Sequence, residues 1–307
     1  MLNYIFLTNI PFSSKPTSKV WKNGLASFWE NSFSLNSTYG SLWSPVLTDS
    51  HSHKDVNSIH LSIYGENILQ NSGYSGWGLG CLNDTWMYIH DTAVSSNTVL
   101  TNNKDHVSKQ GAGITENILT QYLDYGRADS GSALLNGKHY RNLVSVYPQD
   151  SKNSYFILFD EVNARVNTKV NIALHPSSSI YSKVTDKQEY SWIIKNMSPN
   201  NVYVNIFLAT QPESVEIKNG SLCSTKNSIA WKYIYSTYLT KGGNKNVVTI
   251  IFPYEMSHSK ANITRISETS YTGAIIDQGD LIKDYALESS STTPVTYNGV
   301  NFKAQET

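Results

Sequence analysis

The sequence is poor in charge and has no long apolar run. Only 16% of its 307 residues are Asp, Glu, Lys or Arg, and 24 basic residues balance 24 acidic ones. A protein that binds nucleic acid mainly through electrostatics needs a basic face to neutralise phosphates, so the composition argues against that class. No continuous apolar stretch exceeds about ten residues, which is too short to cross a bilayer. We therefore expect no nucleic-acid partner and no membrane span.

Cysteine and targeting signals are equally sparse. Cys81 and Cys223 lie far apart and form no C-x-x-C pair, so they are interpreted as two thiols or as one disulfide. The first residues, Met1–Thr8, have no basic segment before their apolar run and do not look like a secretory signal. These features leave the cellular compartment unknown.

Neutral polar and aromatic residues are abundant instead. Asn, Ser and Thr make up about 31% of the chain, alongside 20 Tyr and 7 Trp. Hydroxyl, amide and aromatic side chains favour strand edges, turns and contacts with sugars over helices. The 39% of hydrophobic residues is ample for a packed core, which excludes a disordered chain.

The hydrophobic pattern predicts strands almost from end to end. Val202–Leu208 alternates with period two, and Tyr155–Phe159 is a short apolar run. Further predicted strands are Ser58–Tyr64, Trp86–His90, Asn97–Leu100, Gly113–Tyr125, Asn142–Tyr147, Lys169–Leu174, Tyr190–Ile194, Ile229–Leu239, Val247–Phe252, Ala261–Ile266, Thr272–Ile276 and Val295–Phe302. Many short strands separated by turn signals predict an all-β fold, a large antiparallel β-sandwich with little helix.

The chain divides softly into three parts. Residues 1–45 are predicted to be an N-terminal extension with one short helix around Lys19–Phe33. Residues 46–200 contain the residues that could do chemistry, up to the turn near Ser198. Residues 201–307 are interpreted either as a continuation of the sandwich or as a smaller C-terminal β-domain.

The window richest in chemistry is Asp49–Asp55, which reads Asp-Ser-His-Ser-His-Lys-Asp. His51 and His53 stand two residues apart, so on a strand both rings would face one site. One neutral imidazole can act as a base or a metal ligand while its neighbour takes the other role. A chance arrangement in a polar loop is the alternative.

The segments around this window form an ordered series. They are His51–Gly73, Thr92–Leu100, Asn102–His106, Tyr140–Pro148, Tyr155–Val162 and Asn171–Pro176. In order and spacing the series resembles the heparinase II/III family, over roughly residues 45–180. That resemblance implies a two-layer supersandwich that follows an N-terminal helical toroid. It also implies cleavage of uronate-containing polysaccharides by β-elimination, with a related branch that epimerises uronates.

The resemblance also assigns roles to the two histidines. It makes His51 a catalytic residue for proton transfer or for neutralising the substrate carboxylate, with His53 beside it. His53 also matches a structural zinc ligand of several members, whose other ligand positions are Asn71 and Ser96 here. Amide and hydroxyl oxygens replace carboxylate and imidazole poorly at zinc. We therefore expect no cofactor and no tight structural zinc, although His90 or His106 could stand in.

Three further residues are predicted to bind substrate. Tyr74 and Trp77 follow the window directly and could stack on a pyranose ring, with plain packing on the sheet as the rival. Arg141 could pair with a substrate carboxylate, or with Asp160 or Glu161 inside the fold. His60 and His175 are interpreted as packed histidines of the sheet.

The function predicted from these features is that of an acidic-polysaccharide lyase. Its glycan would be a glycosaminoglycan, alginate or a similar polymer. Since 307 residues leave no room for a toroid, the chain is interpreted as the sandwich part of a split or truncated enzyme, whose toroid is missing or supplied by a partner chain. The alternative is a glycan-binding or structural sandwich that has lost the reaction. A glycan degrader would be expected to be secreted or periplasmic.

Overall fold

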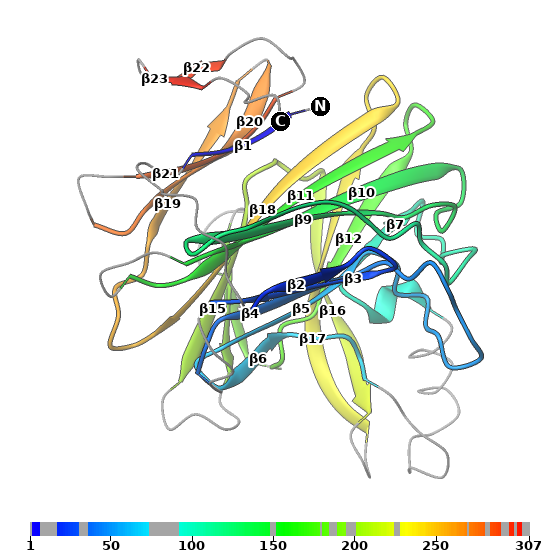
Figure 1. Ribbon diagram of the computed structural model, residues 1–307, viewed down its shortest axis with the longest axis horizontal. Coiled ribbons are helices and arrows are strands. Elements are labelled where there is room, and N and C mark those ends of the chain that lie inside the picture. The colour runs from blue at the N-terminus through cyan, green and yellow to red at the C-terminus, as the bar shows by residue number, and fades with distance from the viewer. Residues whose placement is uncertain are drawn as a thin grey trace.

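The protein is built almost entirely from antiparallel β-sheets (Figure 1). The computed structural model describes residues 2–6, 17–30, 36–73, 92–147, 152–178, 180–183, 189–194, 201–223, 228–268, 270–279, 283–289, 295–297 and 300–302. Within these ranges the one helical element is a 3-10 turn, η1 (Ala93–Ser95). The same ranges contain no helix long and apolar enough to cross a membrane.

An eight-stranded sheet forms the centre of the molecule. In spatial order its strands are β13 (Tyr181–Lys183), β14 (Glu189–Ile194), β15 (Val202–Leu208), β18 (Asn244–Glu255), β11 (Tyr155–Ala164), β10 (Gly137–Val146), β9 (Leu123–Asp129) and β8 (Ile114–Leu119). Because β15 and β18 pair beside β11, strands from both sides of residue 200 share this sheet. The division into domains stays a prediction.

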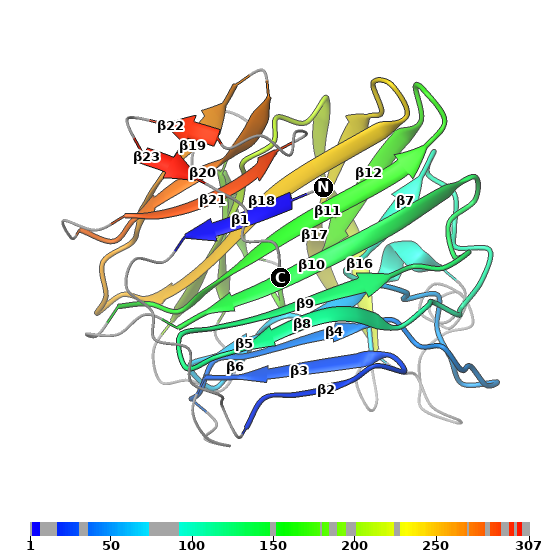
Figure 2. The same ribbon diagram turned by 45° about the horizontal axis from the view of Figure 1, so that its top comes forward.

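Two smaller sheets cover one face of the central sheet. The five-stranded sheet contains β2 (Lys19–Trp21), β3 (Leu25–Trp29), β4 (Tyr39–Trp43), β5 (Ser58–Ile63) and β6 (Glu66–Leu69). The four-stranded sheet contains β16 (Ser214–Cys223), β17 (Ser228–Leu239), β12 (Lys169–Leu174) and β7 (Val99–Thr101). A bridge between Leu69 and Pro176 joins the two sheets. Figure 2 shows β2–β6 lying along the lower side of the central strands.

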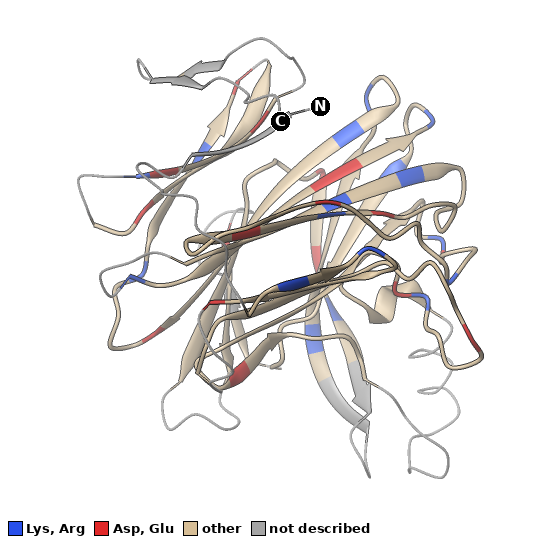
Figure 3. Cartoon of the chain, viewed as in Figure 1, with Lys and Arg blue, Asp and Glu red and all other residues tan. Residues whose placement is uncertain are grey.

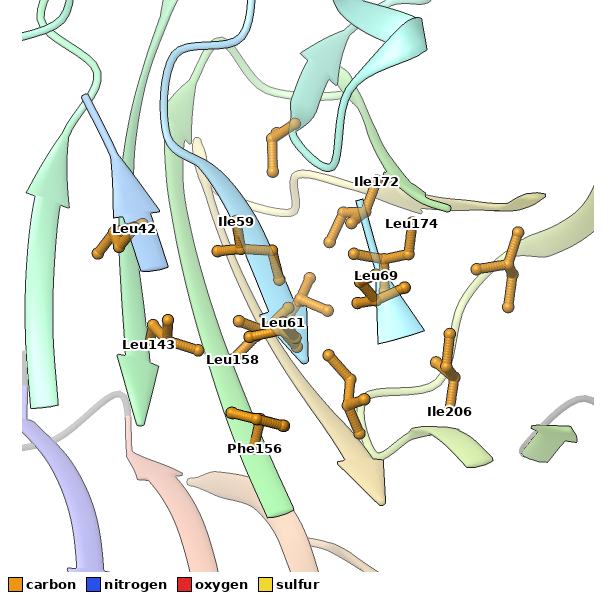
Figure 4. Packing of buried hydrophobic residues seen from close by; sticks show 14 of the residues in the cluster. Leu42, Ile59, Leu61, Leu69, Leu143, Phe156, Leu158, Ile172, Leu174 and Ile206 are labelled. Atoms are coloured by element: carbon orange, nitrogen blue, oxygen red, sulfur yellow. The ribbon is translucent and has the colours of Figure 1, made fainter. Parts of the chain in front are cut away.

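The main hydrophobic core lies between these layers. Leu42 and Ile59 from the five-stranded sheet meet Leu143 and Leu158 of the central sheet, and Ile172 joins them from β12 (Figure 4). All five side chains are essentially excluded from water. Inward residues alternate with outward ones along β4 and β5, as expected for strands with one buried face. The layered β-sandwich expected from the sequence is confirmed.

A fourth sheet packs on the other face of the central sheet. It contains β1 (Leu2–Phe6), β21 (Asp284–Ser289), β20 (Tyr271–Asp277) and β19 (Asn262–Ser267). A second core cluster joins the two sheets through residues such as Val144, Phe252, Ala274 and Ala286. The hairpin of β22 (Val295–Tyr297) and β23 (Val300–Phe302) completes the described strands.

The helix expected around Lys19–Phe33 is wrong. That region forms the β2–β3 hairpin, in which Ala26 and Phe28 point into the core. The apolar residues therefore follow a period of two on a strand rather than a helical stripe. Gly24 makes the turn: its φ is +143°, and a Cβ there would lie 2.7 Å from the Cα of Pro45.

Two other strand predictions need comment. Gly113–Tyr125, expected as one strand, contains β8 and the start of β9, which are joined by a turn in which the Thr120 N–H bonds to the Leu123 carbonyl at 3.0 Å. The predicted strand Trp86–His90 lies outside the described residues.

Candidate functional site

The loop that joins β4 to β5 carries both histidines of the His-x-His-x-Asp segment. His51 is exposed and His53 is half-buried. Both line one open cavity of about 490 Å³. The described residues that line it are Trp43, Leu47, Thr48, Asp49, His51, Ser52, His53 and Asp55. The segment lies in a turn rather than on a strand, so the alternation of a strand is not what brings both residues to this cavity.

Asp49 organises the turn that holds His51. Its Oδ1 accepts the backbone N–H of His51 at 2.8 Å, and its own N–H donates to Ser52 Oγ at 2.9 Å. An aspartate that bonds the backbone two residues ahead is a common way to close a tight turn. The His51 N–H also lowers the pKa of the Asp49 carboxyl. A bond within the local sequence thus holds the backbone of His51.

Asp55 ends the segment on the buried side of the cavity. Burial raises the pKa of its carboxyl to about 7, although a hydrogen bond from the Trp43 side chain and the charge of Lys109 act in the opposite direction. Near neutral pH this carboxyl is therefore not held firmly in its ionised form, as the carboxyl of an exposed aspartate would be. A carboxyl group in this state can take part in proton transfer.

Three lining residues lie before the window that the sequence singled out, and the aromatic one among them is Trp43. It ends β4 and keeps 38% of its surface exposed, while its side chain bonds to Asp55. No motif around Trp43 marked it in the sequence, although it stands only six residues before Asp49. An exposed indole at the mouth of a cavity offers a flat apolar surface to the C–H face of a sugar.

Asn71 and Asn97 tie together the segments next to this loop. The Asn71 Oδ1 accepts the Asn97 backbone N–H at 2.9 Å and its Nδ2 at 3.3 Å. Asn71 Nδ2 donates to Ser58 Oγ at 3.2 Å, so the amide is engaged on both sides. Asn97 also donates to the Ile59 carbonyl at 3.0 Å and accepts the His175 N–H at 2.6 Å. These bonds join β5 to the segments that precede β7 and follow β12.

The residues present do not suit a structural zinc. Asn71 and Ser96 are brought close by the Asn97 bonds, but they offer only an amide and a hydroxyl group, and the amide oxygen is already an acceptor. Zinc in structural sites takes thiolate, imidazole or carboxylate ligands. His106 bonds the Val99 carbonyl at 2.9 Å through its Nε2. Within the described ranges no cluster of three or more His, Cys, Asp or Glu could hold a metal ion.

Arg141 lies in the interior and pairs with Asp160. Its Nε and Nη2 donate to the two carboxylate oxygens at 2.7 and 3.1 Å, and neither residue has exposed surface. His139 Nε2 donates to the same carboxylate at 2.7 Å. Burial alone would raise the pKa of Asp160, but the Arg141 charge and the His139 bond lower it to about 2. Arg141 therefore pairs with Asp160 inside the fold, and it has no exposed surface with which to bind a glycan carboxylate.

The remaining candidates fall in different places. His175 is fully buried, its ring centroid lies 4.5 Å from that of Tyr233, and burial lowers its pKa to about 3. His60, expected to be packed, is exposed on the outer face of β5. Tyr74, Trp77 and His90 lie outside the described residues, so their predicted roles stay predictions.

Comparison with known families identifies the fold. The sequence profile described as "Heparinase II/III-like, C-terminal" matches residues 24–264, which is most of the chain. The chain belongs to this family. The match includes the His51–Asp55 loop, the central sheet and the Asn71–Asn97 contacts. A search among curated proteins finds no match.

Solved structures agree on the fold of this heparinase II/III-like domain. Heparinase III, the BT4657 gene product, superposes with a TM-score of 0.71 at 15% identity, covering 89% of this chain and 42% of its own. Another heparinase III structure gives 0.68 at 16% identity, with 89% and 43% covered. The heparan sulfate lyase HepC from Pedobacter heparinus gives 0.71 at 15% identity, with 89% and 42% covered. The domain thus spans less than half the length of the structures it resembles.

Proposed function

We propose that this heparinase II/III-like domain acts on acidic, uronate-containing polysaccharides at the cavity of His51 and His53. One observation carries the proposal: both histidines of the His-x-His-x-Asp segment line a single open cavity. The family relation supports it, since the lyases that the domain resembles are named for heparin and heparan sulfate. Two imidazoles in one open cavity are well suited to moving protons on a bound sugar.

The proposed reaction is β-elimination next to the uronate carboxylate. A base removes the proton from C5, and the electron pair of that C–H bond forms the C4–C5 double bond. The C4–O bond breaks at the same time, and the leaving oxygen takes up a proton. The products are a chain end with an unsaturated uronate and a new free hydroxyl group. The step needs no oxidant, and no part of it uses a metal.

The cavity residues divide the work as follows. His51, exposed and fixed by Asp49, transfers the proton or neutralises the uronate carboxylate, and His53 stands beside it. Asp55 is partly protonated near pH 7, which limits its repulsion of an anionic sugar. Trp43 offers its exposed ring to a sugar face. Tyr74 and Trp77 remain proposed sugar contacts in the segment that follows Gly73.

A partner supplies the rest of the site in this proposal. The domain corresponds to only 42–43% of the heparinase III structures, so more than half of their length has no counterpart here. We place a helical toroid on a second chain, where it would complete the substrate cleft. The most informative control is therefore to measure lyase activity of this domain with and without the proteins that co-purify with it.

The second candidate is a glycan-binding domain without catalysis. The observation that favours it is that Asn71 and Ser96 stand where zinc-bearing relatives are expected to have a carboxylate and an imidazole, and that Asn71 bonds Asn97 instead. A domain that no longer catalyses the reaction can keep its fold through hydrogen bonds between neutral amides, such as those of Asn71 and Asn97. Binding of acidic glycans without any product would then be its whole function.

One experiment separates the two candidates. The protein, alone and with co-purified partners, is incubated with heparan sulfate, hyaluronan and alginate, and the ultraviolet absorbance of unsaturated uronate is followed. We expect absorbance to rise, and His51→Ala to lower the rate at least about hundredfold, the usual contribution of a positioned acid or base. Glycan binding without any absorbance change, with unchanged binding in His51→Ala, would contradict the lyase and establish the binder.

A further inference from the structure

The outer face of the five-stranded sheet carries two exposed tryptophans, Trp21 and Trp43. The hydrogen-bonded register places Trp21 opposite Leu25, and Leu25 opposite Trp43. Directly opposed residues point to the same side of a sheet. Trp21 and Trp43 are 45% and 38% exposed, so this row of the sheet presents two indoles to solvent.

The next rows on this face are polar and aromatic. Lys19, Ser27, Ser41 and His60 stand opposite one another across β2, β3, β4 and β5. Trp29, Tyr39 and Ser62 form a third row, in which the rings of Trp29 and Tyr39 lie 4.4 Å apart. The opposite face of the same strands holds Ala26, Phe28, Leu42, Ile59 and Leu61, which belong to the core. The aromatic residues are therefore not needed to fill the core.

This face continues directly into the candidate cavity. Trp43 belongs both to the first row and to the lining of the His51–His53 cavity. Trp21 lies two strands away from Trp43, which is roughly 10 Å at the usual strand spacing. That separation is close to the length of a disaccharide, so two sugars along a chain could stack on the two indoles in turn.

The charges on this face are positive. The Lys19 ammonium lies 5.2 Å from the centre of the Trp21 ring, and Lys22 follows in the exposed turn. Lys19 is the one basic residue of β2, and this strand has no acidic residue, as the colours of Figure 3 also show. None of the residues in the three rows is acidic. An anionic chain that leaves the cavity along this face would meet aromatic rings and ammonium groups rather than carboxylates.

We propose that this outer face is an extended binding platform for an acidic glycan, with Trp21 and Trp43 as stacking residues and Lys19 as an anion contact. The platform rests on the proposed function, because it extends the substrate path of the same cavity. It binds sugars remote from the reacting bond, so its contribution grows with the length of the oligosaccharide. Short oligosaccharides reach only the cavity and Trp43.

Binding of heparan sulfate oligosaccharides of graded length tests the platform. Calorimetric titration of Trp21→Ala should show about five- to tenfold weaker binding of a hexasaccharide and less than about twofold change for a disaccharide, as expected for the loss of one aromatic stack. Lys19→Ala should show a smaller loss that disappears at high salt. The control is Tyr181→Ala, which removes an exposed aromatic of similar exposure, 37%, from β13 of the central sheet. Circular dichroism confirms that each variant is folded.

The outcomes separate this proposal from the elimination reaction. Wild-type affinity of Trp21→Ala for the hexasaccharide, or an equal loss in Tyr181→Ala, would overturn the platform even if unsaturated product is still formed. If Trp21→Ala loses affinity only for the longer oligosaccharides, and no glycan gives unsaturated product, the platform is supported and the lyase activity is contradicted. If Trp21→Ala instead releases a co-purified protein and binds glycan normally, the face is a protein interface and the proposal is wrong.

Discussion

Replacing Asp160 by Asn should show how much the buried pair of Arg141 and Asp160 stabilises the protein and its candidate site. Asp160 on β11 has no exposed surface and accepts bonds from Arg141 and from His139. In Asp160→Asn the guanidinium stays buried without its counter-charge. Breaking a buried pair in this way costs about 3–5 kcal/mol. Single domains are stable by roughly 5–15 kcal/mol, so the variant should lose a large share of its stability.

The same pair supports the loop of the candidate site. Arg141 Nη1 donates to the Asn57 carbonyl at 2.8 Å and also to the Asn97 carbonyl. Asn57 directly precedes β5 at the end of the loop that carries His51 and His53. A guanidinium that loses its carboxylate partner should hold these carbonyls less firmly. We therefore expect weaker glycan binding at temperatures below the unfolding transition as well.

Urea unfolding followed by circular dichroism measures the effect on the free energy of unfolding. The matched control is Glu216→Gln, which removes one charge from a surface pair with Lys218 at 3.7 Å and should change stability by less than about 0.5 kcal/mol. The double variant Arg141→Met with Asp160→Leu removes both charges and should recover part of the loss. A loss below about 1 kcal/mol in Asp160→Asn would refute the reasoning, since an unpaired buried charge costs more than that.

Three further outcomes are expected. Burial raises the pKa of Asp55 to about 7, so the stability that its neutral form contributes is complete below about pH 4 and is lost as the pH rises through 7. Asp55→Asn should make the free energy of unfolding less dependent on pH. It should also keep acidic-glycan binding above pH 7, which titrations at pH 6 and pH 8 would show. Asn97→Ala removes the bonds to Ile59 and His175 and should cost about 1–3 kcal/mol in urea unfolding, with no change if a chelator or zinc is added. Burial raises the pKa of the Glu288 carboxyl strongly, so its ionised form destabilises the fold at high pH. Glu288→Gln should therefore raise the melting temperature more at pH 8 than at pH 5. An equal change of melting temperature at the two pH values would contradict this.

The sequence predicted the strands well because their signal is local. Val202–Leu208 and Lys169–Leu174 agree with β15 and β12, since alternation and apolar runs depend only on neighbouring residues. The hairpin of β2 and β3 was missed for a related reason. A short segment with Val20, Leu25 and Phe28 fits a helical stripe as easily as two strands, and only the turn at Gly24 against Pro45 decides between them.

The candidate site was predicted in part. The sequence singled out His51 and His53 by assuming a strand; both residues line one cavity, but in a turn closed by Asp49, and their roles stay predictions. Trp43 could not be assigned, since nothing local says that the end of β4 returns to the same loop. For Arg141 the sequence could not decide between binding a substrate carboxylate and pairing inside the fold. The answer depends on whether Asp160 on the neighbouring strand lies close enough to pair with it.

The sequence by itself thus determined the all-β class, the absence of a strongly basic surface and the histidine pair. Each of these depends on composition or on residues within one turn of the chain. Only the tertiary structure decided which charges are buried and which aromatic residues stay exposed. Those properties depend on the pairing of strands far apart in the sequence: β10 against β11 encloses Arg141, and β2, β3 and β4 side by side align Trp21 with Trp43.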